Sequence, residues 1–181
     1  MSRLLERAGI VIVSLAVSVA AIAALSGFFA GQDAAPVSGS ASTPGMAFRD
    51  LGHEHLRPGQ PKPVYDSRPP TSGAHVPEPV PADRSYLSHD ALLQALEVGD
   101  VVLMYGGRAP PPGLQALARA LAPPFTSELA TTGQAVVLAR RPSTPGVLGL
   151  AWAHAVRVSA PQDPALVAFA RFWLGRGAPG R

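Results

Sequence analysis

The residues of this chain that could perform coordination chemistry are its histidines. Five are present, His53, His55, His75, His89 and His154, and cysteine is absent. Two histidines one residue apart on an extended segment point to the same side, so His53 and His55 suit two ligands of one metal ion. Imidazole favours copper, zinc or nickel. The alternative is a set of loop histidines without a metal, and His154, on the large apolar face of an expected strand, is predicted to be a core histidine.

Catalysis by a nucleophile or an acid–base pair has little support in the residues. The absence of cysteine excludes disulfides, thiolate zinc sites and cysteine nucleophiles. Ser72 lies near His75, but no G-x-S-x-G elbow is present, and a triad also needs an oriented base and an oxyanion hole. Gly106-Gly107-Arg108 could hold an anion between a strand and a helix, but it lacks the lysine and hydroxyl residue of a P-loop, so a plain turn is expected. No catalytic residue is assigned.

The composition of the N-terminal segment predicts that the histidine-bearing part of the chain is anchored to a membrane. Residues 9–30 are almost wholly aliphatic or small, and as a helix they would span roughly 33 Å, against about 30 Å of bilayer hydrocarbon. Arg3 and Arg7 precede this run, which favours a cytoplasmic N-terminus. We therefore predict a cytoplasmic segment at 1–7, a single transmembrane anchor at 8–30 and an extracytoplasmic remainder in the cell membrane. A cleaved signal peptide, with its small-x-small pattern at 21–23, is the alternative.

The rest of the chain divides by composition. Residues 31–45 are small, polar and almost uncharged, which predicts a flexible linker. Residues 46–181 form the expected extracytoplasmic domain, with a proline-rich wrap at 46–87 and a core at 88–175. The net charge is only +3 and the basic residues are scattered, so a nucleic-acid partner is not expected. No residue pattern identifies a protein partner.

Local patterns in the core predict alternating helices and strands. The expected elements are a helix from Ser88 to about Glu97, a strand at 101–105, a helix from Pro111 or Pro112 to about Leu121, a strand at 134–140, a hairpin turn at 142–146, one long strand at 147–158 and a helix that starts at Asp163-Pro164. This order gives a βαββα core, in part ferredoxin-like. The predicted fold class is α+β, with helices on a small mixed sheet and with Trp152 and Trp173 buried in one core. The connection between the strands at 101–105 and 134–140 is long enough for parallel pairing.

One segment resembles a known family signature. Residues 65–75 read YDSRPPTSGAH, which resembles the Y-x-S-x-P-P-T-S-G-x-H motif of the bacterial domain of unknown function 3105 family. The motif residues here are Tyr65, Pro69, Pro70, Thr71, Ser72, Gly73 and His75. The resemblance implies a membrane anchor, a short linker and one exported domain, and it transfers no activity. It also implies two helix histidines that would form a metal site with His75, at positions that hold Gln94 and Val98 in this chain.

These observations leave three classes of function open. The sequence favours a non-catalytic binding or interaction module. The alternative is a copper- or zinc-binding domain that uses His55 and His75, with His53 or His89 replacing the missing helix histidines, and an enzyme is the third reading. The geometry expected of a metal site is His55 and His75 within about 4–5 Å of each other, together with a third donor. The prolines and Gly73 predict a rigid loop that holds His75 away from bulk solvent.

Overall fold

A computed structural model describes residues 43–180 of the chain. The predicted anchor at 8–30 and nearly all of the linker lie outside the described residues. Within 43–180, no helix has the length and apolar character needed to cross a membrane. The described part confirms a mixed α+β fold built on one five-stranded sheet.

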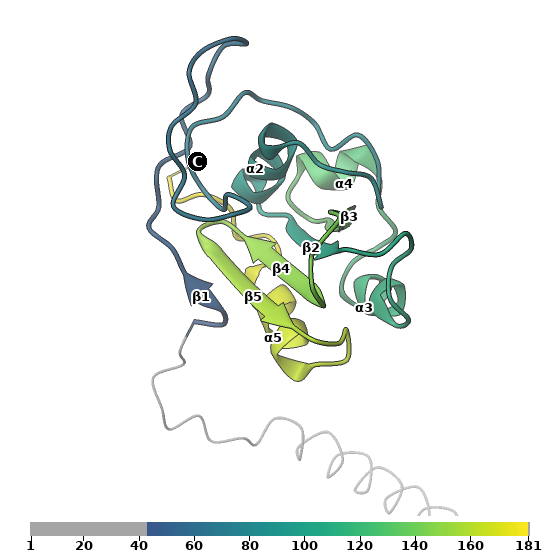
Figure 1. Cartoon of the computed structure of the whole chain (residues 1–181). Helices are drawn as coiled ribbons and strands as arrows, with labels where there is room; N and C mark the ends of the chain where they lie inside the picture. Colours follow the sequence, from purple (N-terminus) through teal and green to yellow (C-terminus); the bar gives the residue numbers. More distant parts are fainter. Residues whose placement is uncertain (1–42, 181) are drawn as a thin grey trace, which may run out of the picture. The chain divides into compact units, whose positions relative to one another are not determined.

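The strands stand in the order β1-β5-β4-β2-β3 (Figure 1). Their bounds are Met46–Ala47 for β1, Val101–Tyr105 for β2, Val136–Arg140 for β3, Val147–Ala151 for β4 and His154–Val158 for β5. β2 and β3 are parallel, with Val101 opposite Val136, whereas the pairs β2–β4, β4–β5 and β5–β1 are antiparallel. The link from β2 to β3 contains α3 (Leu114–Leu121) and α4 (Ser127–Thr131), which provide the long crossover that parallel pairing needs.

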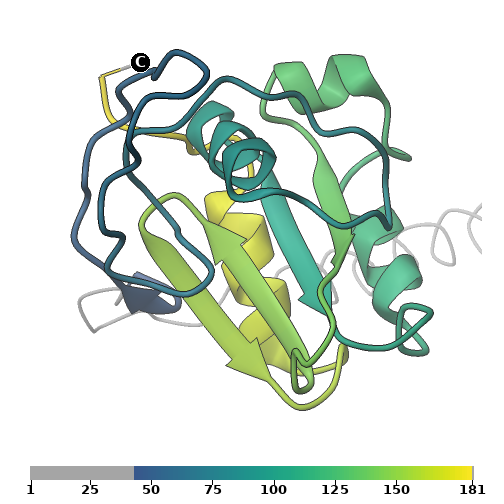
Figure 2. The same cartoon turned by 45° about the horizontal axis from the view of Figure 1, so that its top comes forward.

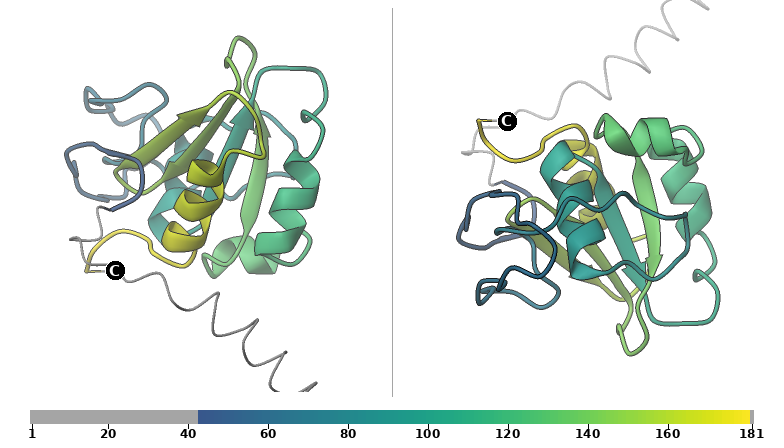
Figure 3. Two further views of the ribbon diagram at one scale, coloured as in Figure 1. Left: turned by 90° about the horizontal axis from the view of Figure 1, so that it is seen from below. Right: turned by 90° about the horizontal axis from the view of Figure 1, so that it is seen from above.

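Helices cover both faces of this sheet. α2 (His89–Val98) packs against one face together with α4, and α3 packs against the opposite face together with α5 (Pro164–Trp173). The two views of Figure 3 show these pairs on opposite sides of the strands. Every residue of β2 and of β4 is buried. α2 packs on β2, while β4 has α5 on one face and residues 67–71 near the other. A strand enclosed on both sides is apolar throughout, which is the pattern that residues 101–105 display.

The ends of α2 and α5 follow the local signals in the sequence. Ser88 Oγ accepts a hydrogen bond from the Ala91 amide at 3.0 Å, and Gly99 ends α2 with a φ of +114°, a conformation that favours glycine. Asp163 caps α5 in the same way, with Pro164 at the first helical position. Both predicted helices are therefore confirmed, and the first of them places Glu97 in its last turn.

The predicted long strand at 147–158 is wrong. It is a hairpin of β4 and β5, whose two-residue turn is Trp152-Ala153, with Ala153 at a φ of +54°. Ala151 pairs with His154, so the turn reverses which alternate residues face each side of the sheet. The prediction that both tryptophans share one core is also wrong, because Trp152 packs with the α2 side of the sheet and half-buried Trp173 with the α5 side.

The turn at 142–146 also differs from the prediction. It joins β3 to β4, but these strands do not pair, since β2 lies between them. The expected hairpin, and with it the partly ferredoxin-like βαββα arrangement, is therefore not present. The short elements β1 and α4 were not predicted, and α3 begins at Leu114 rather than at the preceding prolines. Sheet order depends on contacts between distant segments, which local periodicity does not encode.

Candidate metal centre

Backbone hydrogen bonds join the motif segment at 65–75 to the segment that precedes it in the sequence. The amide of His75 donates to the carbonyl of Glu54 at 3.1 Å, and the amide of Leu56 donates to the carbonyl of His75 at 2.8 Å. A third bond, from the Gly73 amide to the Gly52 carbonyl, continues this pairing. The bridge sets His55 and His75 side by side, although 20 positions separate them in the sequence.

Side-chain hydrogen bonds fix the loop from within. Ser72 Oγ donates to the Arg49 carbonyl and accepts from the Leu51 amide, while Ser67 Oγ accepts from the Thr71 amide. The Tyr65 hydroxyl donates to the Ala74 carbonyl at 2.9 Å. Ser72 is buried and used in this way to hold backbone, which is a structural role for a serine that stands near a histidine.

The loop is also joined to the sheet. The carbonyl of Thr71 accepts the amide of Ala153 at the tip of the β4–β5 hairpin. Figure 2 shows the dark blue loop beside this end of the hairpin. Gly73 has a φ of +119°, and a β-carbon there would lie 3.0 Å from the Tyr65 ring, so a residue without a side chain is needed. His75 is consequently held in the interior of the domain, with no exposed surface.

Glu97 brings a third donor to the two histidines. Its Oε2 atom lies 2.9 Å from Nε2 of His55 and 3.2 Å from Nε2 of His75. The two imidazole centroids are 5.4 Å apart, and one ligand atom from each of the three residues lies within 4.8 Å of the others. These are the two histidines named from the sequence, and the third donor is a carboxylate rather than His53 or His89.

The hydrogen bond at one ring nitrogen of His75 determines whether the other ring nitrogen, which faces the Glu97 carboxylate, carries a proton or a lone pair. Nδ1 lies 3.0 Å from the Gly73 carbonyl, which can only accept, so we assign the ring proton to Nδ1. Nε2 of that tautomer then carries a lone pair, is fully buried and makes no hydrogen bond. It faces a carboxylate oxygen at 3.2 Å. Two electron-rich atoms this close in a buried place are stabilised by a cation between them, either a proton or a metal ion.

The three residues fit a metal ion with one ligand position left open. Two imidazoles and one carboxylate form a known zinc ligand set, and ligand atoms about 2.0–2.2 Å from a tetrahedral ion stand roughly 3.3–3.6 Å apart. The observed 2.9 and 3.2 Å are slightly shorter, and of the two contacts the one between His55 and Glu97 is a hydrogen bond. The bond from His75 Nδ1 to a carbonyl is the usual outer contact that orients a metal-bound imidazole. The His55 side chain is 49% exposed, which leaves a path for the ion and for water.

The other predicted site residues lie elsewhere. His53 packs edge-on against Trp152 at 6.3 Å, and His89 contacts Tyr65 and Arg141. His154 stacks on Trp173 at a centroid distance of 3.9 Å, on the α5 side of the sheet. None of the three belongs to the His55–His75–Glu97 cluster.

Gln94 and Val98 are not part of the cluster either. They line a separate cavity between α2, residues 77–80 and α4, where the Gln94 Oε1 atom is buried without a hydrogen bond. Glu97 was missed as a donor, although it stands directly after Leu96 on the buried side of α2. A carboxylate within an apolar stripe was the available signal, because such a group is rarely buried without a partner.

Taken together, the fold and the cluster define a small mixed α+β domain with a preformed site of two imidazoles and one carboxylate. The family model described as "Protein of unknown function (DUF3105)" matches residues 59–179. The chain belongs to this family. No curated protein and no solved structure matches it.

Proposed function

We propose that this domain binds one divalent transition-metal ion, zinc or copper(II), through His55, His75 and Glu97. The observation that carries the proposal is the convergence of two Nε2 atoms on Oε2 of Glu97, at 2.9 and 3.2 Å. The nitrogen of His75 is buried without a hydrogen bond, and its opposite nitrogen is already oriented by a carbonyl. A metal ion would accept the lone pair and would offset the charge of the Glu97 carboxylate.

The donor types restrict the ion. Imidazole and carboxylate ligands suit zinc and copper(II), whereas magnesium and calcium prefer sites made only of oxygen. Without cysteine in the chain, a soft-ligand site for copper(I) would have to rely on methionine, and no methionine contributes to the cluster. The proposed role is binding rather than catalysis. Backbone pairing positions the two histidines, and helix α2 positions Glu97.

The cellular setting of this site is part of the proposal. The apolar run at 9–30 and the arginines before it support a single membrane span with the domain outside the cytoplasm. In that arrangement the linker at 31–45, which is small and polar in composition, would connect the span to the domain and present the metal site to the extracytoplasmic space. A binding or interaction module anchored in this way agrees with a family of unknown function.

Calorimetric titration with zinc and with copper(II) tests the proposal, using the full chain in detergent after passage over a chelating resin. We expect one ion per chain, and we expect His75→Ala and Glu97→Gln each to weaken binding by at least about 100-fold, since each removes a direct ligand. His53→Ala is the matched control, because His53 lies two residues from His55 and outside the cluster. Equal affinity in the wild type and all three variants would refute the site, as would the absence of binding at micromolar metal.

A further inference from the structure

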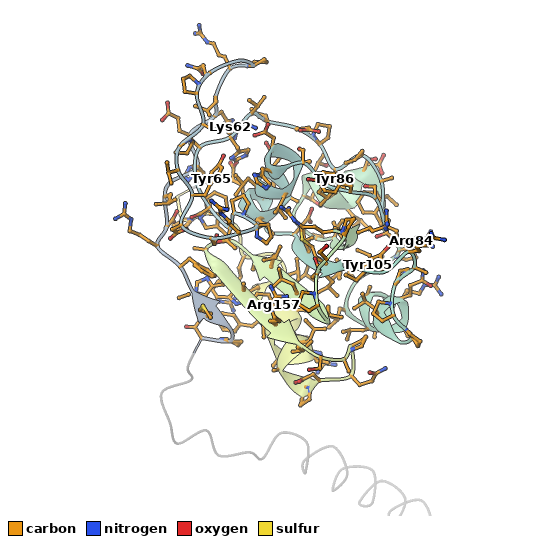
Figure 4. The ribbon with its side chains drawn as sticks, viewed as in Figure 1. Lys62, Tyr65, Arg84, Tyr86, Tyr105 and Arg157 are labelled. Carbon is orange, nitrogen blue, oxygen red and sulfur yellow. The ribbon has the colours of Figure 1, made fainter. Side chains whose placement is uncertain are left out.

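A second cavity, distinct from the metal cluster, lies where the proline-rich segment crosses the start of α2. Its volume is about 390 Å³, and its wall includes Pro63, Val64, Tyr65, Arg68, His89 and Arg141. The wall thus combines residues 63–65 and 67–68, the first residue of α2 and the residue that follows β3. Figure 4 shows Tyr65 and Lys62 on this side of the domain, beside α2.

The charged groups of the cavity all have the same sign. Arg68 and Arg141 contribute two guanidinium groups, and no carboxylate lines the wall. Across residues 43–180, neither arginine has a carboxylate oxygen within 4.0 Å. The neighbouring acid, Asp90, is already engaged by Lys62 Nζ at 2.5 Å and by the Val76 amide at 3.2 Å. The cavity therefore has a positive charge that its own wall does not neutralise.

Arg141 has donor capacity that the protein leaves unused. Its Nη1 atom is buried and makes no hydrogen bond, and its Nη2 atom lies 3.3 Å from His89 Nε2. A guanidinium can only donate, so His89 accepts through Nε2 and is neutral in this contact. Burial first, and then the charges of Arg141 and Lys62, lower the pKa of His89, which agrees with the neutral form. A buried donor without an acceptor is costly, and an oxyanion would supply two acceptors in the geometry that a guanidinium prefers.

The rest of the wall is largely apolar. Pro63, Val64 and the Tyr65 ring form it, and Val64 is 95% exposed. The cavity is also much larger than an inorganic anion requires. An anion with a small carbon body would place its charged group against the arginines and its apolar part against these side chains, which is the usual division of a small-molecule site.

We propose that this cavity binds a small organic anion, with a carboxylate or phosphate group held by Arg141 and Arg68 and an apolar body against Pro63, Val64 and Tyr65. The site is independent of the metal centre in its residues. Tyr65 connects the two, because its hydroxyl holds the Ala74 carbonyl next to His75.

Titration calorimetry on the full chain in detergent tests this site, with phenyl phosphate, benzoate and inorganic phosphate as the probes. The buffers are stripped of metal on a chelating resin, so that binding cannot occur through an ion at His55, His75 and Glu97. We expect phenyl phosphate or benzoate to bind saturably and more tightly than inorganic phosphate. Whichever of the two binds more tightly identifies the preferred charged group.

Two variants distinguish a specific anion-binding site from general electrostatic attraction to a basic protein. Arg141→Gln should weaken binding of the tighter probe by at least 10-fold. Arg108→Gln removes the same charge at an exposed position outside the cavity and should change the affinity by less than 2-fold. Absence of saturable binding by every probe would overturn the proposal, as would equal losses in the two variants. Circular dichroism of both variants verifies that each one is folded.

Discussion

Asp100 provides a direct test of how burial controls the stability of this domain. It lies between α2 and β2, is 1% exposed, and accepts the Ala135 amide through Oδ1 at 2.8 Å. Its Oδ2 atom is buried without a hydrogen bond. Burial raises the pKa of Asp100 from 3.8 to about 7, and the hydrogen bond from Ala135 opposes this only in part.

The direction of the resulting pH dependence follows from proton binding. The folded state holds the Asp100 proton more tightly than the unfolded state does, so stability is highest below pH 4 and falls as the pH rises towards the folded pKa of about 7. The difference between 3.8 and about 7 is worth about 4 kcal/mol in total. About 3 kcal/mol of this should be lost between pH 4.5 and pH 8, because the remainder is lost at lower pH.

Asp100→Asn removes this titration and retains an oxygen that can accept the Ala135 amide. We expect the free energy of unfolding of the wild type to fall, relative to that of the variant, by about 3 kcal/mol from pH 4.5 to pH 8. Guanidinium unfolding of residues 43–181, followed by tryptophan fluorescence at several pH values, measures this difference. Asp50→Asn, at an exposed carboxylate, controls for the loss of one negative charge. Parallel pH profiles for the wild type and Asp100→Asn would refute the reasoning.

Two further substitutions test the loop and the α5 side of the sheet. Gly73→Ala should lower the free energy of unfolding by about 1–3 kcal/mol and weaken metal binding, because its φ of +119° and the Tyr65 ring at 3.0 Å both oppose a β-carbon. Gly59→Ala is the control, since nothing lies within 4 Å of a β-carbon there, and an equal effect of the two substitutions would contradict this. Trp173→Ala should cost about 2–4 kcal/mol in thermal or chemical unfolding, since the half-buried ring also donates to the Pro44 carbonyl at 2.9 Å. A loss below about 1 kcal/mol would mean that this ring does not stabilise α5.

The sequence alone was sufficient for the elements whose signals are local. Ser88 and Gly99 bound α2, and Asp163 with Pro164 begins α5, because caps and proline act within one helical turn. The apolar run at 101–105 predicted β2, and the motif at 65–75 indicated the family that the whole-domain match supports. His55 and His75 were also singled out from the sequence as candidate ligands, on residue type and motif.

The contacts between segments that are distant in the sequence became known from the tertiary structure. The apolar residues at 147–158 are compatible with one strand or with a hairpin, and the contacts of Ala153 with Phe48 and Thr71 hold the turn that separates β4 from β5. Trp152 and Trp173 pack in clusters on opposite faces of the sheet, which local patterns did not indicate.

The candidate site depends on distant contacts in the same way. His55 and His75 are joined by backbone pairing across 20 positions, and Glu97 reaches them from a helix 22 positions beyond His75. Both separations far exceed one helical turn or one strand repeat, so no local pattern could give the distances between the three donors. The residue types determined which chemistry was available, and the packing of α2 against the loop determined which donors share a site. Burial of Glu97 beside two imidazoles is what makes the carboxylate a ligand candidate rather than a surface charge.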